Sequence, residues 1–251
     1  DVPIIAQLNH GGYTCKANRV TASEYSTPQW KARALLISEI EEIEEAFANS
    51  AQLALQANFD GIQIHAAHGY LISQFLSNIT NKRKDQYGGS LENRARLLME
   101  TYSKIRKAVG NEVIIGVKIN CDDFAEKGGF TLEESIKVMR WLEEKGIDFI
   151  EISGGGPQQV GSIRKTRARA PEGSGIEEAT FGGHAIQIRK KVKKVPLALV
   201  DGIRSKKTME NLLKQNVVDL IAMSKPFIIE PDFPKKLKEG QERSSCTDCK
   251  L

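Results

Sequence analysis

The sequence has little cysteine and no apolar run long enough to cross a membrane. Only four of its 251 residues are cysteines, and no hydrophobic run approaches the roughly 18 residues that a transmembrane helix needs. No signal-peptide pattern opens the chain, and two of the cysteines are isolated, so the spacing does not suggest a disulfide framework. These absences disfavour membrane-spanning and disulfide-rich secreted classes and predict a reducing, cytoplasmic setting.

A large excess of charge of one sign is also missing. The 36 lysines and arginines exceed the 32 acidic residues by only four. The densest lysine run, at 190–194, is typical of a solvated helix end, where cations also interact favourably with the helix dipole. The chain is therefore not expected to bind nucleic acid or membrane surfaces. A small molecule is its expected partner. Self-association is left open.

The chain lacks an initiator methionine and opens directly as a strand at residues 2–8. It stops at Leu251, just after the pair Cys246-x-x-Cys249. We therefore expect both ends to be cut. Iron–sulfur clusters and structural zinc sites need about four ligands, so this pair is an incomplete site within the chain.

Apolar runs of strand length alternate with amphipathic helical patterns. Such alternation predicts a parallel sheet with right-handed crossovers. No Gly-x-Gly-x-x-Gly opens the chain, and the strand-to-helix links are the long ones, so we prefer a (β/α)8 TIM barrel over a doubly wound sheet. About six units, strands 3–8, would be present, with residues 1–240 as the barrel domain and 241–251 as a tail. The predicted strands cover residues 2–8, 60–64, 113–119, 147–152, 195–200 and 217–223.

Three helix starts carry capping signals. Ser38 is followed by Glu41, and Thr131 by Glu134, which is the spacing of a capping box. Ser90 precedes a third periodic run. Residues between the first strand and the first helix are expected to be irregular, and so are residues 65–89.

Three of the four histidines, His10, His65 and His68, fall in the predicted strand-to-helix loops. The pair His65-x-x-His68 can donate two hydrogen bonds to one anionic or carbonyl oxygen. It can also ligate a metal, although no third ligand stands at zinc-site spacing. The alternative is that both rings only satisfy loop carbonyls. Tyr70, two residues on, is either a general acid or a packed aromatic.

Charged and flexible residues mark the ends of three predicted strands. Lys118 lies inside an apolar strand, where a buried charge is costly unless it meets a partner. It therefore points into the site toward an electron-rich ligand or reaches solvent at the rim. The last two strands end at Gly202 with Arg204, and at Ser224 with Lys225. The corresponding loops of barrels often bind phosphate.

The longest motifs identify a family. The chain closely resembles the old yellow enzymes, which are FMN-dependent NAD(P)H:flavin oxidoreductases or ene-reductases. The resemblance runs along essentially the whole chain. It rests on Gln7-Leu8-x-His10-x-Gly12, on His65-x-x-His68-Gly69-Tyr70-Leu71-x-x-Gln74-Phe75-Leu76-Ser77, and on Asn81-x-Arg83-x-Asp85-x-Tyr87-Gly88-Gly89-Ser90-x-Glu92-Asn93-Arg94-x-Arg96.

The resemblance implies roles for the residues already singled out. It implies a barrel with non-covalent FMN at the carboxyl ends of the strands. Gln7 would hydrogen-bond the polar edge of the flavin, and Lys118 would stand where most relatives have an arginine. His65 and His68 match the pair that binds the substrate carbonyl oxygen, and Tyr70 matches the proton donor. Phosphate-binding turns are matched by Gly202, Ser224 and Lys225.

The implied reaction is ping-pong. NADH or NADPH reduces FMN and leaves, and an electron-poor alkene then receives a hydride at its β-carbon and a proton at its α-carbon. Two other functions stay open. One is a truncated, non-catalytic flavin-binding or interaction remnant of the barrel, because its first two βα units are expected upstream of Asp1. The other is a metal-dependent hydrolase that uses the histidine pair.

Overall fold

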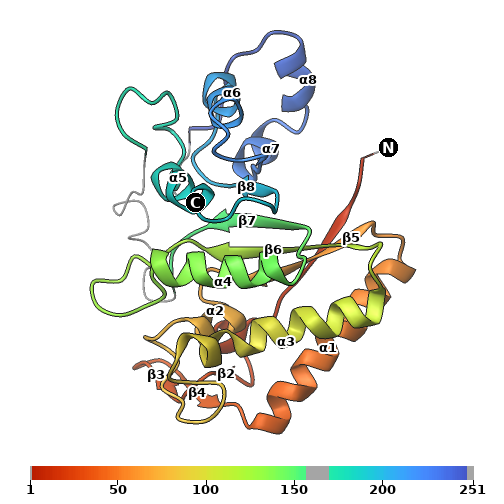
Figure 1. The fold of residues 1–251 in the computed structure, drawn as a ribbon, viewed down its shortest axis with the longest axis vertical. Helices are drawn as coiled ribbons and strands as arrows, with labels where there is room; N and C mark the ends of the chain where they lie inside the picture. Colours follow the sequence, from red (N-terminus) through yellow and green to blue (C-terminus); the bar gives the residue numbers. More distant parts are fainter. Residues whose placement is uncertain (1, 157–169, 248–251) are drawn as a thin grey trace.

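A sheet of six parallel strands organises the computed structural model, which describes residues 2–156 and 170–247 (Figure 1). The strands are β1 (Ile5–Leu8), β5 (Gly61–Ala66), β6 (Ile114–Asn120), β7 (Phe149–Ser153), β8 (Leu197–Leu199) and β9 (Leu220–Ile221). Their spatial order equals their order in the chain. A doubly wound sheet reverses strand order at a switch point, whereas a barrel adds each strand beside the previous one. The barrel prediction is therefore confirmed, with six units present.

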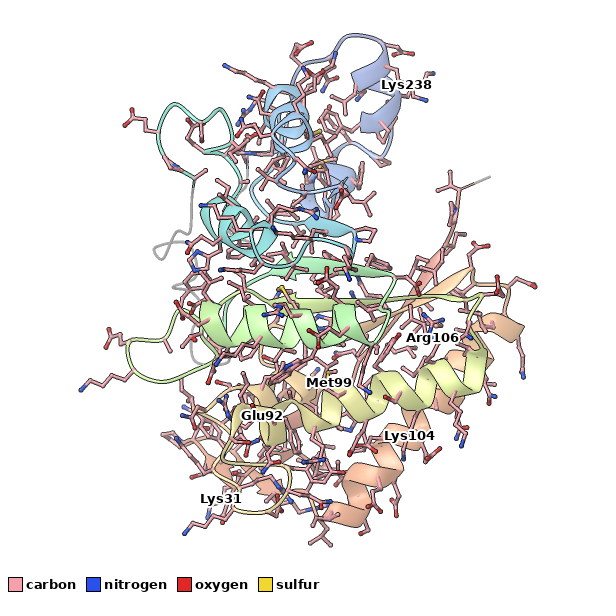
Figure 2. The ribbon with its side chains drawn as sticks, viewed as in Figure 1. Lys31, Glu92, Met99, Lys104, Arg106 and Lys238 are labelled. Carbon is pink, nitrogen blue, oxygen red and sulfur yellow. The ribbon has the colours of Figure 1, made fainter. Side chains whose placement is uncertain are left out.

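Helices follow each strand and cover the sheet. The longer ones are α1 (Ile37–Gln56), α3 (Leu91–Val109), α4 (Leu132–Glu144), α5 (Gly182–Arg189) and α6 (Lys206–Lys214). Shorter ones are α2 (Leu71–Leu76), α7 (Lys225–Ile229) and α8 (Phe233–Lys238). Figure 1 shows α1 and α3 side by side, and Lys104, labelled on α3 in Figure 2, forms ion pairs with Glu44 and Glu45 of α1.

Alternation along the central strands gives the sheet one apolar and one polar face. The apolar residues are fully buried in the core, namely Ile62, Ile64, Ile115, Val117, Ile119, Ile150 and Ile152. The alternating positions carry Gln63, His65, Lys118, Asn120, Glu151 and Ser153. Because successive side chains of a strand point to opposite faces, these polar residues share the face that becomes the interior of a barrel. The sheet therefore gathers polar groups on one side before any loop contributes.

Two of the three predicted helix starts are confirmed. Ser90 accepts a hydrogen bond from the backbone N–H of Asn93, and Thr131 accepts one from that of Glu134. The prediction of Ser38 as a cap is wrong, because α1 begins earlier, with Leu36 at the N-cap. There the Glu39 carboxylate accepts from the Leu36 N–H at 2.8 Å.

Several short elements were not predicted. The segment expected to be irregular contains the 3₁₀ turn η1 (Gly12–Thr14) and a small sheet of β2 (Val20–Thr21), β3 (Tyr25–Ser26) and β4 (Lys31–Ala34). The expected long loop at 65–89 contains α2. The same loop was expected to include His65, but β5 continues to Ala66, so His65 lies on the strand.

The tail packs against the barrel over part of its length. The Ser244 N–H donates to the Arg204 carbonyl at 2.9 Å, and Arg243 forms an ion pair with Glu178 at 2.7 Å. A boundary at residue 240 stays a prediction. Across the described ranges, no helix combines the length and apolarity needed to cross a membrane.

Candidate active site

The two predicted histidines and the tyrosine lie together at the carboxyl end of β5. The rings of His65 and His68 have centroids 5.1 Å apart, and those of His65 and Tyr70 are 4.9 Å apart, both edge to face. His65 is supplied by the strand, His68 by the turn after it, and Tyr70 by the N-cap of α2. The grouping predicted from the motif is therefore present.

The hydrogen bond of His65 defines which of its nitrogens carries a proton. Its Nδ1 accepts from the backbone N–H of Ala67 at 3.2 Å. A neutral imidazole has one donor and one acceptor nitrogen, so the proton of His65 is on Nε2. The ring can thus donate one hydrogen bond to an oxygen placed beside it.

His68 is held in an uncommon backbone conformation by its neighbours. Its φ of +60° lies in the left-handed region, which is unfavourable for residues other than glycine. The Asn120 side-chain oxygen accepts from the His68 N–H at 3.1 Å, and Ser153 Oγ lies 2.6 Å from His68 Nε2. Asn120 of β6 therefore holds the backbone of His68, and Ser153 of β7 orients its ring.

Both histidines are neutral near pH 7. Burial first, and then the electrostatic influence of His68 and Lys118, lower the pKa of His65 to about 4. Desolvation of the ring, followed by the charge of Lys118, lowers the pKa of His68 to about 4, although the residue as a whole is exposed at the mouth of the site. Neutral rings can polarise a carbonyl oxygen without adding a full charge to the site.

Lys118 points to the polar face of the sheet and meets a carboxylate there. Its Nζ lies 2.9 Å from Glu151 Oε1. The other oxygen of Glu151 accepts from Gln63 Nε2 at 2.8 Å, and Gln63 Oε1 accepts from Gln7 Nε2 at 2.5 Å. Gln7 itself is exposed on this open face, where its remaining polar atoms can meet a ligand.

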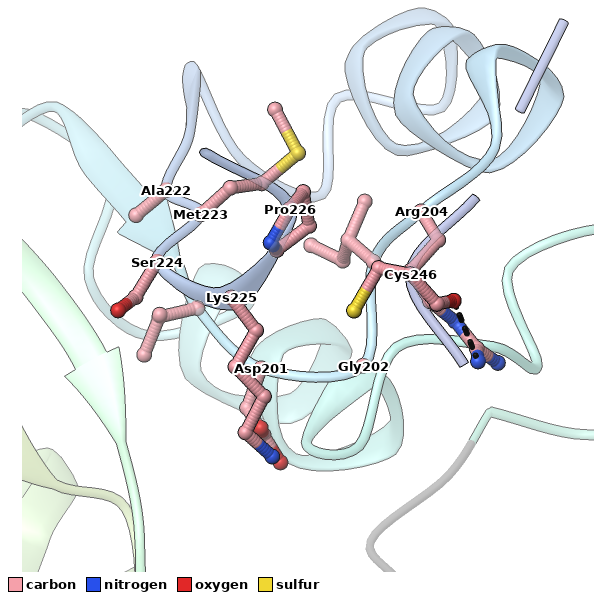
Figure 3. Close-up of a pocket in the computed structure, with 11 residues that line it drawn as sticks. Asp201, Gly202, Arg204, Ala222, Met223, Ser224, Lys225, Pro226 and Cys246 are labelled. Atoms are coloured by element: carbon pink, nitrogen blue, oxygen red, sulfur yellow. Dashed lines mark hydrogen bonds between the residues drawn. The ribbon is translucent and has the colours of Figure 1, made fainter. Parts of the chain in front are cut away.

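A separate cavity lies where β8 and β9 end (Figure 3). Its volume of about 120 Å³ leaves room for a small ligand group. Gly202, Ser224 and Lys225 line it, so the predicted phosphate residues are brought together. Gly202 has a φ of +80°, and a Cβ atom there would meet the Glu178 carbonyl oxygen at 2.4 Å. Only glycine fits this turn.

Arg204 also lines this cavity, but its charge is compensated. Its Nε lies 3.2 Å from Glu178 Oε1, and its Nη1 donates to the Cys246 carbonyl at 3.4 Å, the contact drawn in Figure 3. A role for Arg204 as a phosphate ligand thus gains no support from this geometry. Cys246 is buried beside the cavity, whereas Cys249 lies outside the described residues.

The third predicted histidine, His10, bonds to the backbone of its own loop. Its Nδ1 accepts from the Gly12 N–H at 3.1 Å, and burial lowers its pKa. Within residues 2–156 and 170–247, no group of three or more His, Cys, Asp or Glu side chains is arranged to hold a metal ion. The hydrolase hypothesis therefore finds no ligand set among these residues.

Sequence reasoning missed the residues that orient the predicted ones. Asn120, Ser153, Glu151 and Gln63 are each at most 9% exposed, and they connect the strands through side-chain hydrogen bonds. The signal was available, because each is a polar residue at an alternate position of an otherwise apolar strand. From this signal, only Lys118 was predicted to belong to the site.

Asn120 offers a test of how His68 is held. Besides accepting from His68, it donates to Asp123 Oδ1 at 3.0 Å and to the Gly155 carbonyl at 2.9 Å. We expect Asn120→Ala to lower the free energy of unfolding by about 1–3 kcal/mol, measured by urea denaturation, and to move the NMR resonances of the His68 ring. Asn49→Ala, an exposed change on α1, is the matched control. Equal stability of the two variants would contradict this role.

Comparisons with known proteins agree with this arrangement. The model of a family described as the NADH:flavin oxidoreductase / NADH oxidase family matches residues 4–244. An NADH oxidase from Thermoanaerobacter brockii is 38% identical over 221 residues, which are 87% of this chain and 33% of that protein. An NADPH dehydrogenase from Bacillus pumilus is 34% identical over 209 residues, which are 81% of this chain and 55% of that protein.

Solved structures similar to this chain include enzymes related to that family. A complex of 2-naphthoyl-CoA reductase with 2-naphthoyl-CoA superposes with a TM-score of 0.88 at 30% identity, over 98% of this chain and 40% of that one. An old yellow enzyme homologue from Zymomonas mobilis gives a TM-score of 0.73 at 27% identity, over 98% of this chain and 70% of that one. The chain thus spans about a third to just over half of the curated relatives named above.

Proposed function

Because this chain belongs to the NADH:flavin oxidoreductase / NADH oxidase family, the family of the old yellow enzymes, we propose that it reduces the activated C=C bond of α,β-unsaturated carbonyl compounds. The family uses FMN, with NADH or NADPH as the electron donor. The observation that carries the proposal is the grouping of two neutral histidines with Tyr70 at the carboxyl ends of the strands.

The described residues fit FMN. The exposed amide of Gln7 offers a donor and an acceptor to the polar edge of the ring, and Lys118 offers a cation. The cavity lined by Gly202, Ser224 and Lys225 suits the phosphate, since backbone N–H groups of a turn and a lysine favour anions. When bound, FMN supplies the hydride.

The histidines act on the oxygen of the substrate. The proton on His65 Nε2 can be donated to a carbonyl oxygen. His68 is held beside it by Asn120 at its backbone N–H and by Ser153 at its ring. Hydrogen bonds to an oxygen that gains negative charge during the reaction strengthen in the transition state. The Tyr70 hydroxyl then delivers the proton that the α-carbon needs.

The structural relatives support a conjugated carbonyl substrate. The bound molecule in one of them is 2-naphthoyl-CoA, in which a thioester carbonyl is conjugated to unsaturated carbons. Two hydrogen-bond donors at one oxygen suit that chemistry. We also propose that residues 1–240 form the FMN-binding domain, and that the chain works in the cytoplasm.

An absorbance titration tests the proposal. The purified chain is mixed with FMN, passed through a desalting column, and then treated without oxygen first with NADH or NADPH and next with an enone. We expect flavin bands that stay with the protein, bleach with the nicotinamide and recover with the enone. Bands that bleach and never recover would refute the alkene reductase. A chain that retains no flavin would favour the non-catalytic remnant.

A further inference from the structure

We propose that Glu151 is a positioning residue that balances the charge of Lys118 and sets the hydrogen-bond direction of Gln7. The inference rests on the proposed function, because it concerns the residues that would face FMN. Glu151 lies within a chain of side chains that crosses four strands. Gln7 of β1 bonds to Gln63 of β5, and the Glu151 carboxylate of β7 accepts from both Gln63 and Lys118 of β6.

The direction of that chain follows from the carboxylate. An ionised carboxylate only accepts hydrogen bonds, so Gln63 must turn its NH₂ group toward Glu151. Its oxygen then faces Gln7, which must in turn present its own NH₂ group to Gln63. The side-chain oxygen of Gln7 and its second N–H are left for the flavin edge. Glu151 thus determines which side-chain atoms of Gln7, two side chains away, can donate to the flavin and which can accept from it.

The charge of Glu151 has a separate effect. Glu151 is 9% exposed, and its Oε1 lies 2.9 Å from the Lys118 ammonium, so the two charges are only partly screened by water. Two-electron reduction of a flavin places negative charge on its ring, and Lys118 alone would stabilise that charge strongly. Glu151 opposes this stabilisation. It therefore keeps the bound flavin a stronger reductant, which favours hydride transfer to an alkene.

The midpoint potential of the bound flavin tests this role, because a purely structural residue would leave it unmoved. We expect Glu151→Gln to shift the potential to more positive values, and Lys118→Met to shift it to more negative values. Because both charges act on the flavin directly, the double variant Lys118→Met/Glu151→Gln should have a potential between those of the two single variants. Glu210→Gln is the matched control, since Glu210 pairs with Lys214 on the exposed surface of α6 at 2.7 Å.

Gln63→Met separates the two effects. It keeps the ion pair but interrupts the chain to Gln7, so FMN affinity should fall while the potential stays near the wild-type value. If the potential of Glu151→Gln equals that of the wild-type protein, the inference is overturned, whereas the proposed function is not. A Glu151→Gln protein without the wild-type circular dichroism spectrum would also overturn it, because Glu151 would then be a structural residue. A wild-type chain that binds no FMN would overturn the proposed function as well.

Discussion

Replacing Tyr70 with phenylalanine is expected to slow enone reduction by about 10²- to 10⁴-fold, while NADH or NADPH reduces the bound flavin at the wild-type rate. The Tyr70 ring packs edge to face on His65, and phenylalanine keeps that contact. Only the hydroxyl, the proposed proton donor, is lost. Stopped-flow absorbance without oxygen measures flavin reduction and flavin reoxidation as separate phases, so the loss can be assigned to one half-reaction.

The control for this variant is a tyrosine outside the site. Tyr102 is 2% exposed on α3, and its hydroxyl donates to the Lys145 carbonyl at 3.1 Å. Tyr102→Phe makes the same chemical change and should leave both half-reactions unchanged. If Tyr70→Phe reoxidises with an enone as fast as the wild-type protein, another group supplies the proton. If it slows both half-reactions equally, Tyr70 serves binding or packing.

The predictable part of the fold is the part that repeats a local pattern. Ser90 and Thr131 identify helix starts because an N-terminal N–H needs an acceptor, and both side chains supply one. The same reasoning failed at Ser38, since Glu39 satisfies the first turn of α1. Helix α2 was hidden because all six of its residues are buried, which removes the polar face that makes a helix periodic.

The site residues that could be predicted are those of one short sequence motif with recognisable chemistry. His65, His68 and Tyr70 lie within six positions, so a turn alone brings them together. The orientation of His68 depends on Asn120 and Ser153, more than 50 and 80 residues away along the chain. Such contacts are set by the register of parallel strands, which no local pattern encodes. Glu151 itself could have been identified, because it is a polar residue between Ile150 and Ile152 of an apolar strand, but its contact with Lys118 could not.

Replacing Glu44 with glutamine is expected to stabilise the protein at pH 8 and to have little effect at pH 4.5. Glu44 is 1% exposed between α1 and α3. One oxygen lies 3.2 Å from Lys104 Nζ, while Oε1 is buried without a hydrogen-bond partner. Burial first, and then the nearby Glu100 carboxylate, raise the pKa of Glu44 to about 7.

The groups around Glu44 explain the missing partner. Glu100 accepts from the Tyr87 hydroxyl at 2.9 Å, and Lys104 is shared with Glu45 at 2.7 Å. Two carboxylates that face each other cannot donate to each other unless one holds a proton. Protonation of Glu44 supplies that donor. Glutamine keeps the shape of the side chain, always has an N–H to donate, and carries no charge into the interface.

The sign of the effect follows from the pKa shift. The folded state holds a proton on Glu44 between about pH 4.5 and 7, where the unfolded chain has released it. The resulting stability is fully present below pH 4.5 and is lost as the pH rises through 7. Glutamine does not titrate, so Glu44→Gln should gain about 2–3 kcal/mol over the wild-type protein at pH 8.

Urea denaturation at pH 4.5 and pH 8 measures this difference, and Glu45→Gln is its control. Glu45 also contacts Lys104, but its side chain is 62% exposed, so its neutralisation should change stability by no more than about 0.5 kcal/mol at either pH. A gain from Glu44→Gln that is the same at both pH values would reflect packing and not proton binding. A loss at pH 8 would mean that the ionised carboxylate is needed by Lys104, and that this ion pair outweighs the cost of burying the charge.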